Sequence, residues 1–321
     1  MANPPTLEQI RQAADRIGPY VHRTPVLTCR TINAMVGAEI FFKCENFQKA
    51  GAFKFRGATN AVFSLTEKEA SRGVATHSSG NHAAALSLAA RTRGAKAYVV
   101  MPRTAPQVKK DAVAGYGAEI TFCEPTLAAR EQTLEKLVEV TGASAIHPYN
   151  DYRIIAGQAT AALELLEDVV DLDIVMTPIG GGGLASGTAL YVKLTSPETK
   201  VIAAEPMGAD DAYRSFRAGK LIPSENLKTI ADGLLTSLGD KTFPIVTEYL
   251  DDIVTVSEEG IIQAMRCIWE RMKVVVEPSA AVPLGALLTG RLEAAGKRVG
   301  IILSGGNVDL NKLPWISKTD N

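Results

Sequence analysis

The chain has 321 residues, of which 46% are hydrophobic and 21% charged, and its formal net charge is −1. This length allows one large or two ordinary domains, and the balanced charge excludes a global field that would attract nucleic acid or an anionic membrane. No segment is long and apolar enough to span a bilayer, and the N-terminus lacks a basic region followed by an apolar run. The cysteines have no paired spacing, so we expect a reduced, soluble, cytoplasmic protein; they are Cys29, Cys44, Cys123 and Cys267.

Short helices and strands are predicted to alternate along the chain. The first helix begins after Thr6, with Gln9 completing a capping box, and runs to about Ile17. Residues 24–26, Thr-Pro-Val, form an extended connector, because proline disfavours helix at the preceding residue. Apolar runs predict strands over 39–44, 74–79, 95–101, 118–123, 174–179, 200–205, 252–256 and 299–303. Helices are predicted over 83–93, 127–141, 157–167, 184–194, 260–273 and 279–288.

This alternation, with almost continuously apolar strands, is typical of α/β proteins in which helices cover both faces of a parallel sheet. The sequence contains no internal repeat, no low-complexity segment and no linker rich in glycine, serine or proline. Composition therefore gives no domain boundary.

One lysine stands out in residues 43–58, KCENFQKAGAFKFRGA. Lys54 lies between Phe53 and Phe55, where loss of water disfavours the charged ammonium and favours a neutral, nucleophilic amine. Such an amine is what a Schiff-base lysine needs. The alternative is a helix lysine whose stem covers apolar surface while its amine reaches water, and these three residues alone favour that alternative.

Four consecutive glycines, Gly180 to Gly183, follow a predicted strand and lead through Leu184 into a predicted helix. Glycines let backbone N–H groups approach an anion, and the helix N-terminus adds unsatisfied donors, so a phosphate is the natural occupant. A second interpretation stays open, since the spacing also fits a dinucleotide-binding turn with Glu205 as the ribose-binding acid. Four glycines in a row and a position in the middle of the chain are unusual for that turn.

Two more strings lie at the ends of predicted strands. Residues 76–82, THSSGNH, precede a helix, so Ser79 or Asn81 is a candidate N-cap in a loop that points donors into a cleft. Residues 303–309, LSGGNVD, follow an apolar strand near the C-terminus and by themselves read as an ordinary turn.

Together the four strings resemble the motifs of fold-type II pyridoxal-phosphate enzymes, in the serine racemase and serine/threonine dehydratase family that includes 3-hydroxyaspartate ammonia-lyases. The family has serine in place of Ala52 and glycine in place of Ala83. The resemblance implies a tryptophan synthase β-like α/β fold, with two open domains of mostly parallel sheets and the cofactor in the cleft between them. The small domain would be 72–145, inserted in a large cofactor-binding domain of 1–71 plus 146–321.

The resemblance also implies how pyridoxal 5′-phosphate is held. Lys54 would carry it as a Schiff base and, once displaced, remove the substrate α-proton. Asn81 would bind the ring hydroxyl and Ser304 the ring nitrogen. A serine there makes a weaker electron sink than an aspartate, which suits elimination of a good leaving group. The cofactor phosphate would bind Gly180, Gly181, Gly182 and Gly183, with Leu184 beginning the helix.

Substrate contacts follow from the same resemblance. The carboxylate would be bound by Ser78, Ser79 and His82, and Ser79 would be the second acid or base needed for racemisation. A second carboxylate on the substrate would need its own cation, for which Arg130, His147 and Lys49 are candidates. Arg130 is equally explained as an exposed residue of the helix that contains it.

A cation site is predicted in the acidic turn after the strand 200–205. Glu205 and Asp211 flank a glycine-containing turn, and two carboxylates with a backbone carbonyl suit a hard divalent cation. Serine racemase-like proteins have such a site, which implies Mg²⁺ or Ca²⁺ on Glu205, Asp211 and the carbonyl of Ala209. The nucleotide site of animal serine racemases matches poorly, because Cys29–Thr31 and Ala50 replace the expected residues, and we expect no ATP activation.

The resulting prediction is a dehydratase that converts L-serine, L-threonine or 3-hydroxyaspartate to a 2-oxo acid and ammonia by α,β-elimination. Two alternatives are a serine racemase and a non-catalytic sensor of amino acids or nucleotides, although the presence of Lys54 and Ser304 opposes the sensor. We expect a small amino-acid substrate, a homodimer, and no nucleic-acid or membrane partner. No regulatory domain follows Asn321, so no feedback inhibition is expected.

Overall fold

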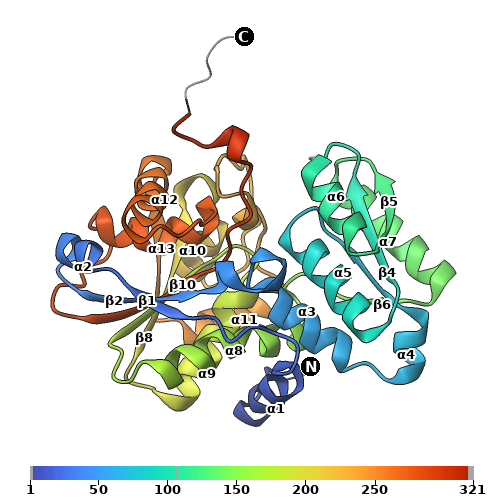
Figure 1. Cartoon of the computed structure of the whole chain (residues 1–321), viewed down its shortest axis with the longest axis horizontal. Helices are drawn as coiled ribbons and strands as arrows, with labels where there is room; N and C mark the ends of the chain where they lie inside the picture. The colour runs from blue at the N-terminus through green and yellow to red at the C-terminus, as the bar shows by residue number, and fades with distance from the viewer. Residues whose placement is uncertain (1–2, 106, 317–321) are drawn as a thin grey trace.

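The structure is a computed structural model, which describes residues 3–105 and 107–316 and arranges the strands in two sheets (Figure 1). The strands are β1 Val26–Thr28, β2 Glu39–Cys44, β3 Val74–His77, β4 Ala97–Pro102, β5 Glu119–Cys123, β6 Ser144–Ala145, β7 Ile174–Pro178, β8 Lys200–Pro206, β9 Asp252–Val256 and β10 Arg298–Leu303. The α-helices are α1 Leu7–Ile17, α2 Arg30–Val36, α3 Lys54–Phe63, α4 Glu67–Arg72, α5 Asn81–Arg93, α6 Gln107–Gly115, α7 Leu127–Thr141, α8 Tyr152–Asp168, α9 Gly183–Thr195, α10 Asp211–Ala218, α11 Thr242–Tyr249, α12 Glu258–Met272 and α13 Pro278–Leu288.

The larger sheet is built from both ends of the chain, in the order β1-β2-β10-β7-β8-β9. Strand β10 inserts between β2 and β7, and every pair from β2 to β9 is parallel. Only β1, at the edge, runs antiparallel to its neighbour β2. The parallel strands therefore present their carboxyl ends at one edge of the sheet, where ligand sites of open α/β proteins form.

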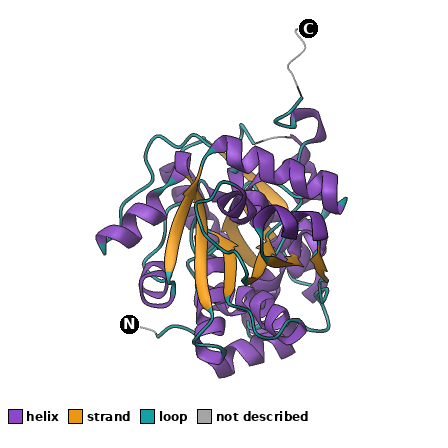
Figure 2. Cartoon of the chain, turned by 90° about the vertical axis from the view of Figure 1, so that its left-hand side faces the viewer, coloured by secondary structure: helices purple, strands orange, loops and turns teal. Residues whose placement is uncertain are grey.

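Helices cover both faces of this sheet (Figure 2). On one face, buried side chains of α2, α12 and α13 pack on the strands, and on the other face those of α1, α8, α9 and α11 do so. The strands β7 and β8 are buried almost throughout, which explains their continuous apolar sequences. In the part of the chain that the structure describes, no helix has the length and apolar character to cross a membrane.

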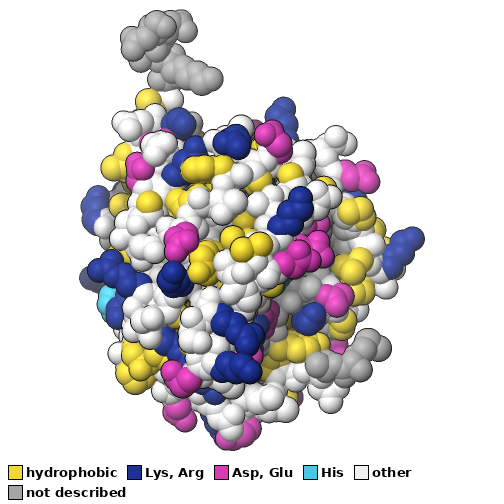
Figure 3. All heavy atoms as spheres, turned by 90° about the vertical axis from the view of Figure 1, so that its right-hand side faces the viewer, with side chains coloured by type: hydrophobic (Ala, Val, Ile, Leu, Met, Phe, Trp, Pro, Cys, Tyr) yellow, Lys and Arg dark blue, Asp and Glu magenta, His cyan; other side chains and the backbone are white. Residues whose placement is uncertain are grey.

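The smaller sheet has the order β5-β4-β3-β6 and is parallel throughout. All its strands come from residues 74–145, whereas the predicted boundaries of the small domain, 72 and 145, remain a prediction. Helix α3 packs against α5, the helix that follows β3. Phe55 and Ala58 of α3 and Leu86 of α5 belong to one buried apolar cluster. The outer face of this half of the molecule carries cationic and anionic side chains side by side (Figure 3).

The predicted α/β class with parallel sheets is confirmed, and several local predictions are correct. Thr6 caps α1 in a capping box with Gln9, and the predicted helix 127–141 coincides with α7. Helix α8 begins at Tyr152, five residues earlier than predicted, because Asp151 accepts the Arg153 N–H as its N-cap. The extended connector at 24–26 continues into the short strand β1, which was not predicted.

Candidate active site

The predicted cofactor residues converge at the carboxyl edge of the larger sheet. Lys54 follows β2, Ser304 follows β10 and the glycine loop follows β7, and these three strands are neighbours in the sheet. The serine and histidine loop follows β3 in the smaller sheet. Parallel pairing thus brings together four strings that are far apart in the sequence.

Lys54 is the first residue of α3, and its amine turns inward. The side chain is half-buried, Nζ donates a hydrogen bond to the Pro148 carbonyl at 3.0 Å, and Nζ lies 5.0 Å from the centre of the Phe53 ring. Burial lowers the pKa of the Lys54 amine to about 8, partly opposed by the charge of Glu277. These contacts favour the nucleophilic interpretation over a surface lysine, because the amine does not reach out to water.

Ser304 is joined directly to the lysine segment. Its carbonyl accepts the Phe53 N–H at 2.9 Å, and Ala52 and Gly305 form an antiparallel bridge next to it. Ser304 itself is only 2% exposed. The turn after β10 therefore fixes the backbone from which Lys54 projects.

The glycine loop is a tight backbone cradle whose walls leave no room for side chains. A Cβ at Gly181 would lie 2.4 Å from the Tyr149 ring, and one at Gly180 would lie 2.8 Å from the Leu234 Cα. Gly182 has φ 84°, a conformation that favours glycine, and no side chain caps the helix α9 that it precedes. The loop thus offers unprotected helix N-terminal donors, which fits the predicted binding of a phosphate at Gly180 to Gly183 and Leu184.

Thr242, which the sequence did not single out, holds this loop, and Asn150 holds the residue before Thr242. The Thr242 hydroxyl donates to the Gly181 carbonyl at 2.9 Å and accepts the Gly239 N–H at 2.9 Å. The Asn150 side chain accepts the Lys241 N–H at 2.8 Å. Neither residue belongs to a recognisable motif, and the fold alone places Thr242 against the cradle and Asn150 against the segment that carries Thr242.

Asn81 begins α5 and is held in one orientation by a buried acid. Its Nδ2 donates to both carboxylate oxygens of Glu277, at 2.9 and 3.1 Å, and its Oδ1 accepts from Asn307 Nδ2 at 3.0 Å. Burial raises the pKa of Glu277 to about 7. Sequence reasoning missed Glu277, because an acid before Pro278 reads as an ordinary helix start.

The loop after β3 leaves the N-terminus of α5 open. Gly80 takes the N-cap position and no side chain caps the helix, so neither Ser79 nor Asn81 is the N-cap considered from the sequence. Ser78 and Ser79 are half-buried, and His82 is buried. Burial, with the charge of Lys54, holds the pKa of His82 well below its usual value, so this ring is neutral at pH 7.

Arg130 and two histidines lie beyond this loop. The ring centres of His77 and His147 are 6.1 Å apart, and the rings are perpendicular. Burial is the main cause that lowers the pKa of His77, and the charge of Arg130 lowers it further. Within the described residues the Arg130 Nε is buried and has no hydrogen-bond partner. Burial lowers the pKa of His147 to about 4, while Lys49 lies elsewhere, with Nζ 5.9 Å from the Phe55 ring. Of the three candidate cations, only Arg130 is both charged and buried without a partner at Nε.

The acidic turn after β8 is buried. The Glu205 carboxylate accepts the N–H groups of Ala212 and Tyr213 at 3.0 and 2.7 Å, and burial raises its pKa well above the usual value. Asp211 Oδ1 accepts from the Ser224 hydroxyl at 2.7 Å, and Asp211 Oδ2 is buried without a partner in the described residues. Across residues 3–105 and 107–316, no group of three or more His, Cys, Asp or Glu side chains could hold a metal.

A cavity of about 690 Å³ opens beside Asn81 and Asn307, between α5 and α6 on one side and residues 306–314 on the other. Ala50 lines this cavity. Beside it, an ion pair of 2.6 Å between Lys109 and Asp232 links the part of the chain that forms the smaller sheet to the part that forms the larger sheet. The expectation that ATP does not activate the protein stays a prediction.

Comparison with known proteins identifies relatives over almost the whole chain. The model of the family described as "Pyridoxal-phosphate dependent enzyme" matches residues 17–305. The chain is 56% identical to a β-hydroxyaspartate dehydratase of Paracoccus denitrificans, over 97% of this chain and 99% of the relative. It is 48% identical to an L-threo-3-hydroxyaspartate ammonia-lyase of Saccharomyces cerevisiae, over 96% and 95%.

A solved structure agrees. The crystal structure of a serine racemase from Dictyostelium discoideum superposes with a TM-score of 0.92 at 53% identity, covering 95% of this chain and 99% of that one. The resemblance and the fold inferred from the four motifs are therefore confirmed, whereas the roles assigned to single residues remain predictions.

The lowered pKa of Lys54 gives a direct test. The chain freed of cofactor should attach pyridoxal phosphate at a rate that rises through about pH 8, because the neutral amine forms there instead of at the ordinary 10.5. The covalent product should be trapped by borohydride and located by mass spectrometry. Lys54→Ala should fold and trap none; a borohydride-stable adduct with full turnover in that variant would assign the linkage to another lysine.

Proposed function

The chain belongs to the family of pyridoxal-phosphate dependent enzymes, and we propose that it is an ammonia-lyase that converts a small L-3-hydroxy amino acid to a 2-oxo acid and ammonia. The observation that carries this proposal is the inward-turned Lys54 amine, with a pKa of about 8, between the Ser304 turn and the glycine cradle. Serine, threonine and 3-hydroxyaspartate all have the required hydroxyl group on the β-carbon.

In this proposal the cofactor is held by the groups described above. The phosphate lies in the cradle of Gly180 to Gly183, the ring contacts Asn81 and Ser304, and Lys54 provides the covalent anchor. When bound, pyridoxal phosphate draws electrons from the substrate α-carbon and so makes its proton acidic. The rigid support of Asn81 by Glu277 and of the Ser304 turn by Phe53 keeps these contacts in fixed directions.

Different residues of the chain have different roles in the elimination. Lys54, once released from the cofactor, takes the α-proton. A pKa near the working pH suits this amine, because it must also return the proton. Ser304 can only hydrogen-bond a ring nitrogen, because a hydroxyl is too weak an acid to protonate it fully. His82 and His147 are held neutral, so they add no positive charge that would further lower the pKa of Lys54.

We infer that the preferred substrate is the dicarboxylic 3-hydroxyaspartate. The open N-terminus of α5 suits one carboxylate, since its backbone donors have no side-chain cap. The half-buried Arg130, whose buried Nε is unpaired among the described residues, suits a second one, because guanidinium groups bind carboxylates with a matching fork. The names of the relatives from Paracoccus denitrificans and Saccharomyces cerevisiae both refer to hydroxyaspartate, which supports this choice.

Serine racemisation is the second candidate, and Ser79 is the observation that favours it. Lys54 serves one face of the substrate carbon, so racemisation needs an acid or base on the other face. Ser79 lies half-buried in the loop before α5, and the Dictyostelium discoideum neighbour is named a serine racemase. Elimination needs only the Lys54 face and becomes irreversible when the product hydrolyses, so it should dominate.

A divalent cation, Mg²⁺ or Ca²⁺, is part of the proposal. Glu205 and Asp211 are buried carboxylates, and Asp211 Oδ2 has no partner in the described chain. Burial raises the pKa of both groups, so a cation would remove a cost of keeping them charged. The ligand set of Glu205, Asp211 and the Ala209 carbonyl has only two acidic side chains, so water must complete it.

The proposal extends to a homodimer in a reducing compartment such as the cytoplasm. Free cysteines at all four positions support the compartment. Large apolar side chains that remain exposed on the single chain, including Met35 and Val275, support association.

A substrate panel tests the proposed function. Oxo-acid release should be faster with an L-3-hydroxyaspartate isomer than with L-serine or L-threonine. Arg130→Ala should raise KM for hydroxyaspartate by about tenfold or more while changing L-serine turnover little, because only the dicarboxylate loses an ion pair. Lys136→Ala, at an exposed cation of the same helix, is the control. No oxo acid from any substrate would contradict the lyase, and equal losses on both substrates would contradict the role of Arg130.

The balance between elimination and racemisation is tested at Ser79. Ser79→Ala should abolish formation and consumption of D-amino acid, because the second face loses its proton donor, and should retain a measurable part of L-dehydratase activity. Chiral chromatography and ammonia release measure the two products. Should the wild type yield mainly D-amino acid with little ammonia, the racemase would replace the lyase as the function.

Chelation tests the cation. Chelator should lower the melting temperature and the activity, and added Mg²⁺ or Ca²⁺ should restore both, because an ion bound only by the native state stabilises it. Glu205→Ala should abolish this response, whereas Asp210→Asn, next to the site, should keep it. An equal melting temperature with and without chelator would refute a structural ion.

A further inference from the structure

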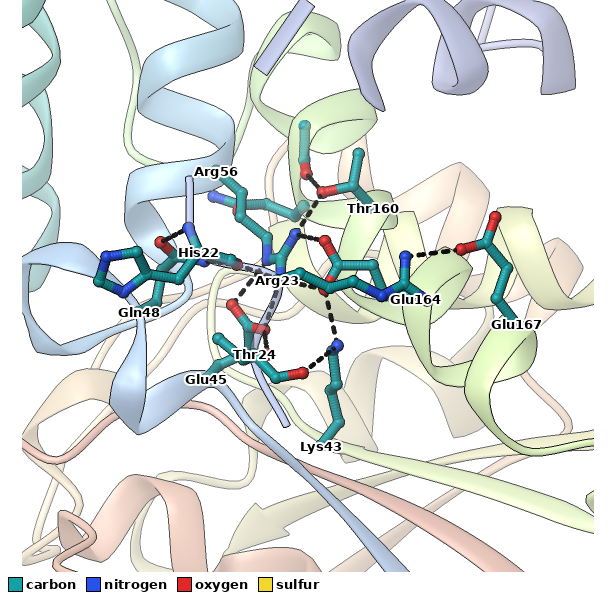
Figure 4. A network of polar contacts seen from close by, with 12 residues as sticks. His22, Arg23, Thr24, Lys43, Glu45, Gln48, Arg56, Thr160, Glu164 and Glu167 are labelled. Carbon is teal, nitrogen blue, oxygen red and sulfur yellow. Dashed lines mark hydrogen bonds and ion pairs between the residues drawn. The ribbon is translucent and has the colours of Figure 1, made fainter. Parts of the chain in front are cut away.

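Arg56 of α3 belongs to a buried network of charged side chains, which also contains Glu45, Lys43 and Glu164 (Figure 4). Lys43 and Arg56 are fully buried, and so is Glu45, while Glu164 of α8 is 8% exposed. Two cations thus meet two carboxylates inside the protein, and none of the four groups contacts the residues assigned to catalysis.

The network uses the fork of Arg56 almost completely. Nε and Nη2 donate to the two oxygens of Glu45 at 2.7 and 2.8 Å, and Nη1 and Nη2 donate to the two oxygens of Glu164, both at 2.7 Å. Nη1 also donates to the Thr160 hydroxyl at 3.2 Å. Two bidentate pairs leave the guanidinium one orientation, whereas a lysine ammonium could not satisfy both carboxylates in this plane.

Lys43 and Thr24 complete the set. Lys43 Nζ donates to Glu164 at 2.6 Å and to the Thr24 carbonyl at 2.7 Å, and the Thr24 hydroxyl donates to Glu45 at 2.6 Å. The network therefore joins strand β2, helix α8, the segment before β1 and helix α3. Buried ion pairs of this kind are often no more stabilising than apolar side chains of similar volume, so stability alone is a weak explanation for it.

Its position relative to Lys54 offers a better explanation. Arg56 follows Lys54 by two residues, which in an α-helix places the side chains on nearly opposite sides, about 200° apart. No side chain caps the start of α3, so the first turn is not fixed by a cap. Instead the helix is held from behind: a Cβ at Gly157 of α8 would lie 2.6 Å from the Gly57 Cα, and Gln158 Oε1 accepts the Gly57 N–H at 3.1 Å.

We propose that Arg56 is a positioning residue for Lys54: its fork, clamped by Glu45 and Glu164, sets the rotation of α3 about its axis and thereby the direction of the Lys54 amine. A rotation of the helix would move the amine sideways, away from the Pro148 carbonyl and from the substrate carbon. This inference rests on the proposed use of Lys54 as anchor and base.

The test compares holoenzymes that differ only at the clamp, by which we mean Arg56 with Glu45 and Glu164. Arg56→Lys keeps the charge and loses the fork, and the double variant Arg56→Met with Glu45→Gln removes one charge of each sign while leaving the Lys43–Glu164 pair intact. Both should melt within a few degrees of the wild type and keep its KM, while kcat falls by about tenfold to hundredfold, since misplacement by 1 Å costs that much. The circular dichroism of the bound cofactor in the visible region should change, because the linkage is held at another angle.

Arg23→Lys is the control, because Arg23 pairs with Glu167 and Asp168 at the exposed end of the same α8. It should leave kcat and the visible circular dichroism unchanged. A folded clamp variant with wild-type kcat and dichroism would overturn the proposal. So would losses of activity that merely follow the fraction of folded protein, or failure of both clamp variants to fold, because the network would then serve stability alone.

The spectroscopic comparison does not depend on which amino acid is turned over. A wild type that binds the cofactor at Lys54 but releases no oxo acid contradicts the proposed function and leaves the clamp comparison valid. A wild type that releases oxo acid and variants that match it contradict only the clamp.

Discussion

The proposed site depends on lowering the pKa of one lysine amine by burial inside the protein. Water is withdrawn from Lys54 by the packing of α3 against α5 and α8, and the resulting pKa of about 8 needs surroundings without additional strong anions close to the amine. Glu277 is the acid that works against this, and its own raised pKa of about 7 limits the opposition. The full charges of Arg56, Lys43, Glu45 and Glu164 are paired with one another behind the helix, where they neutralise each other.

The parallel sheets bring the residues of the site together. Since β2, β10 and β7 are adjacent and parallel, Lys54, the Ser304 turn and the glycine cradle must meet at one edge. The smaller sheet adds a second open helix start, at α5, directed by β3. The N-termini of α5 and α9 both lack a side-chain cap. Helix α5 follows a strand of the smaller sheet and α9 follows a strand of the larger sheet, so each sheet leads into a helix start that suits an anion.

The sequence predicted those parts of the molecule in which a short string contains its own physical reason. The capping box at Thr6, the apolar runs of β7 and β8 and the four glycines at the start of α9 are examples, because burial or backbone geometry dictates their composition. The start of α8 was missed because its first turn, Tyr152 to Ile155, follows the polar residues 149–151 without a distinct boundary in the apolar pattern. The two-sheet division and the order β2-β10-β7 are long-range facts that no local pattern contains.

The same holds within the site. Lys54, Asn81 and Ser304 were predicted as site residues because they lie in recognisable strings. Glu277, Thr242 and Asn150 were not found, because each acts through a contact with a residue far away in the sequence. The direction of the Lys54 amine toward Pro148 was equally beyond the sequence, since the flanking aromatic residues alone favoured a surface lysine.

Strand β10 has a consequence for how the protein comes into being. It is the last strand among the residues that the structure describes, and yet it lies in the interior of the larger sheet, between β2 and β7. During synthesis from the N-terminus, β2 and β7 leave the ribosome long before the strand that joins them, and their apolar edges must wait unpaired. The smaller sheet needs only residues 74–145 and can form during that time. The nascent protein thus contains Lys54 early but receives the Ser304 turn beside it last, so apolar strand edges stay exposed while the chain is unfinished.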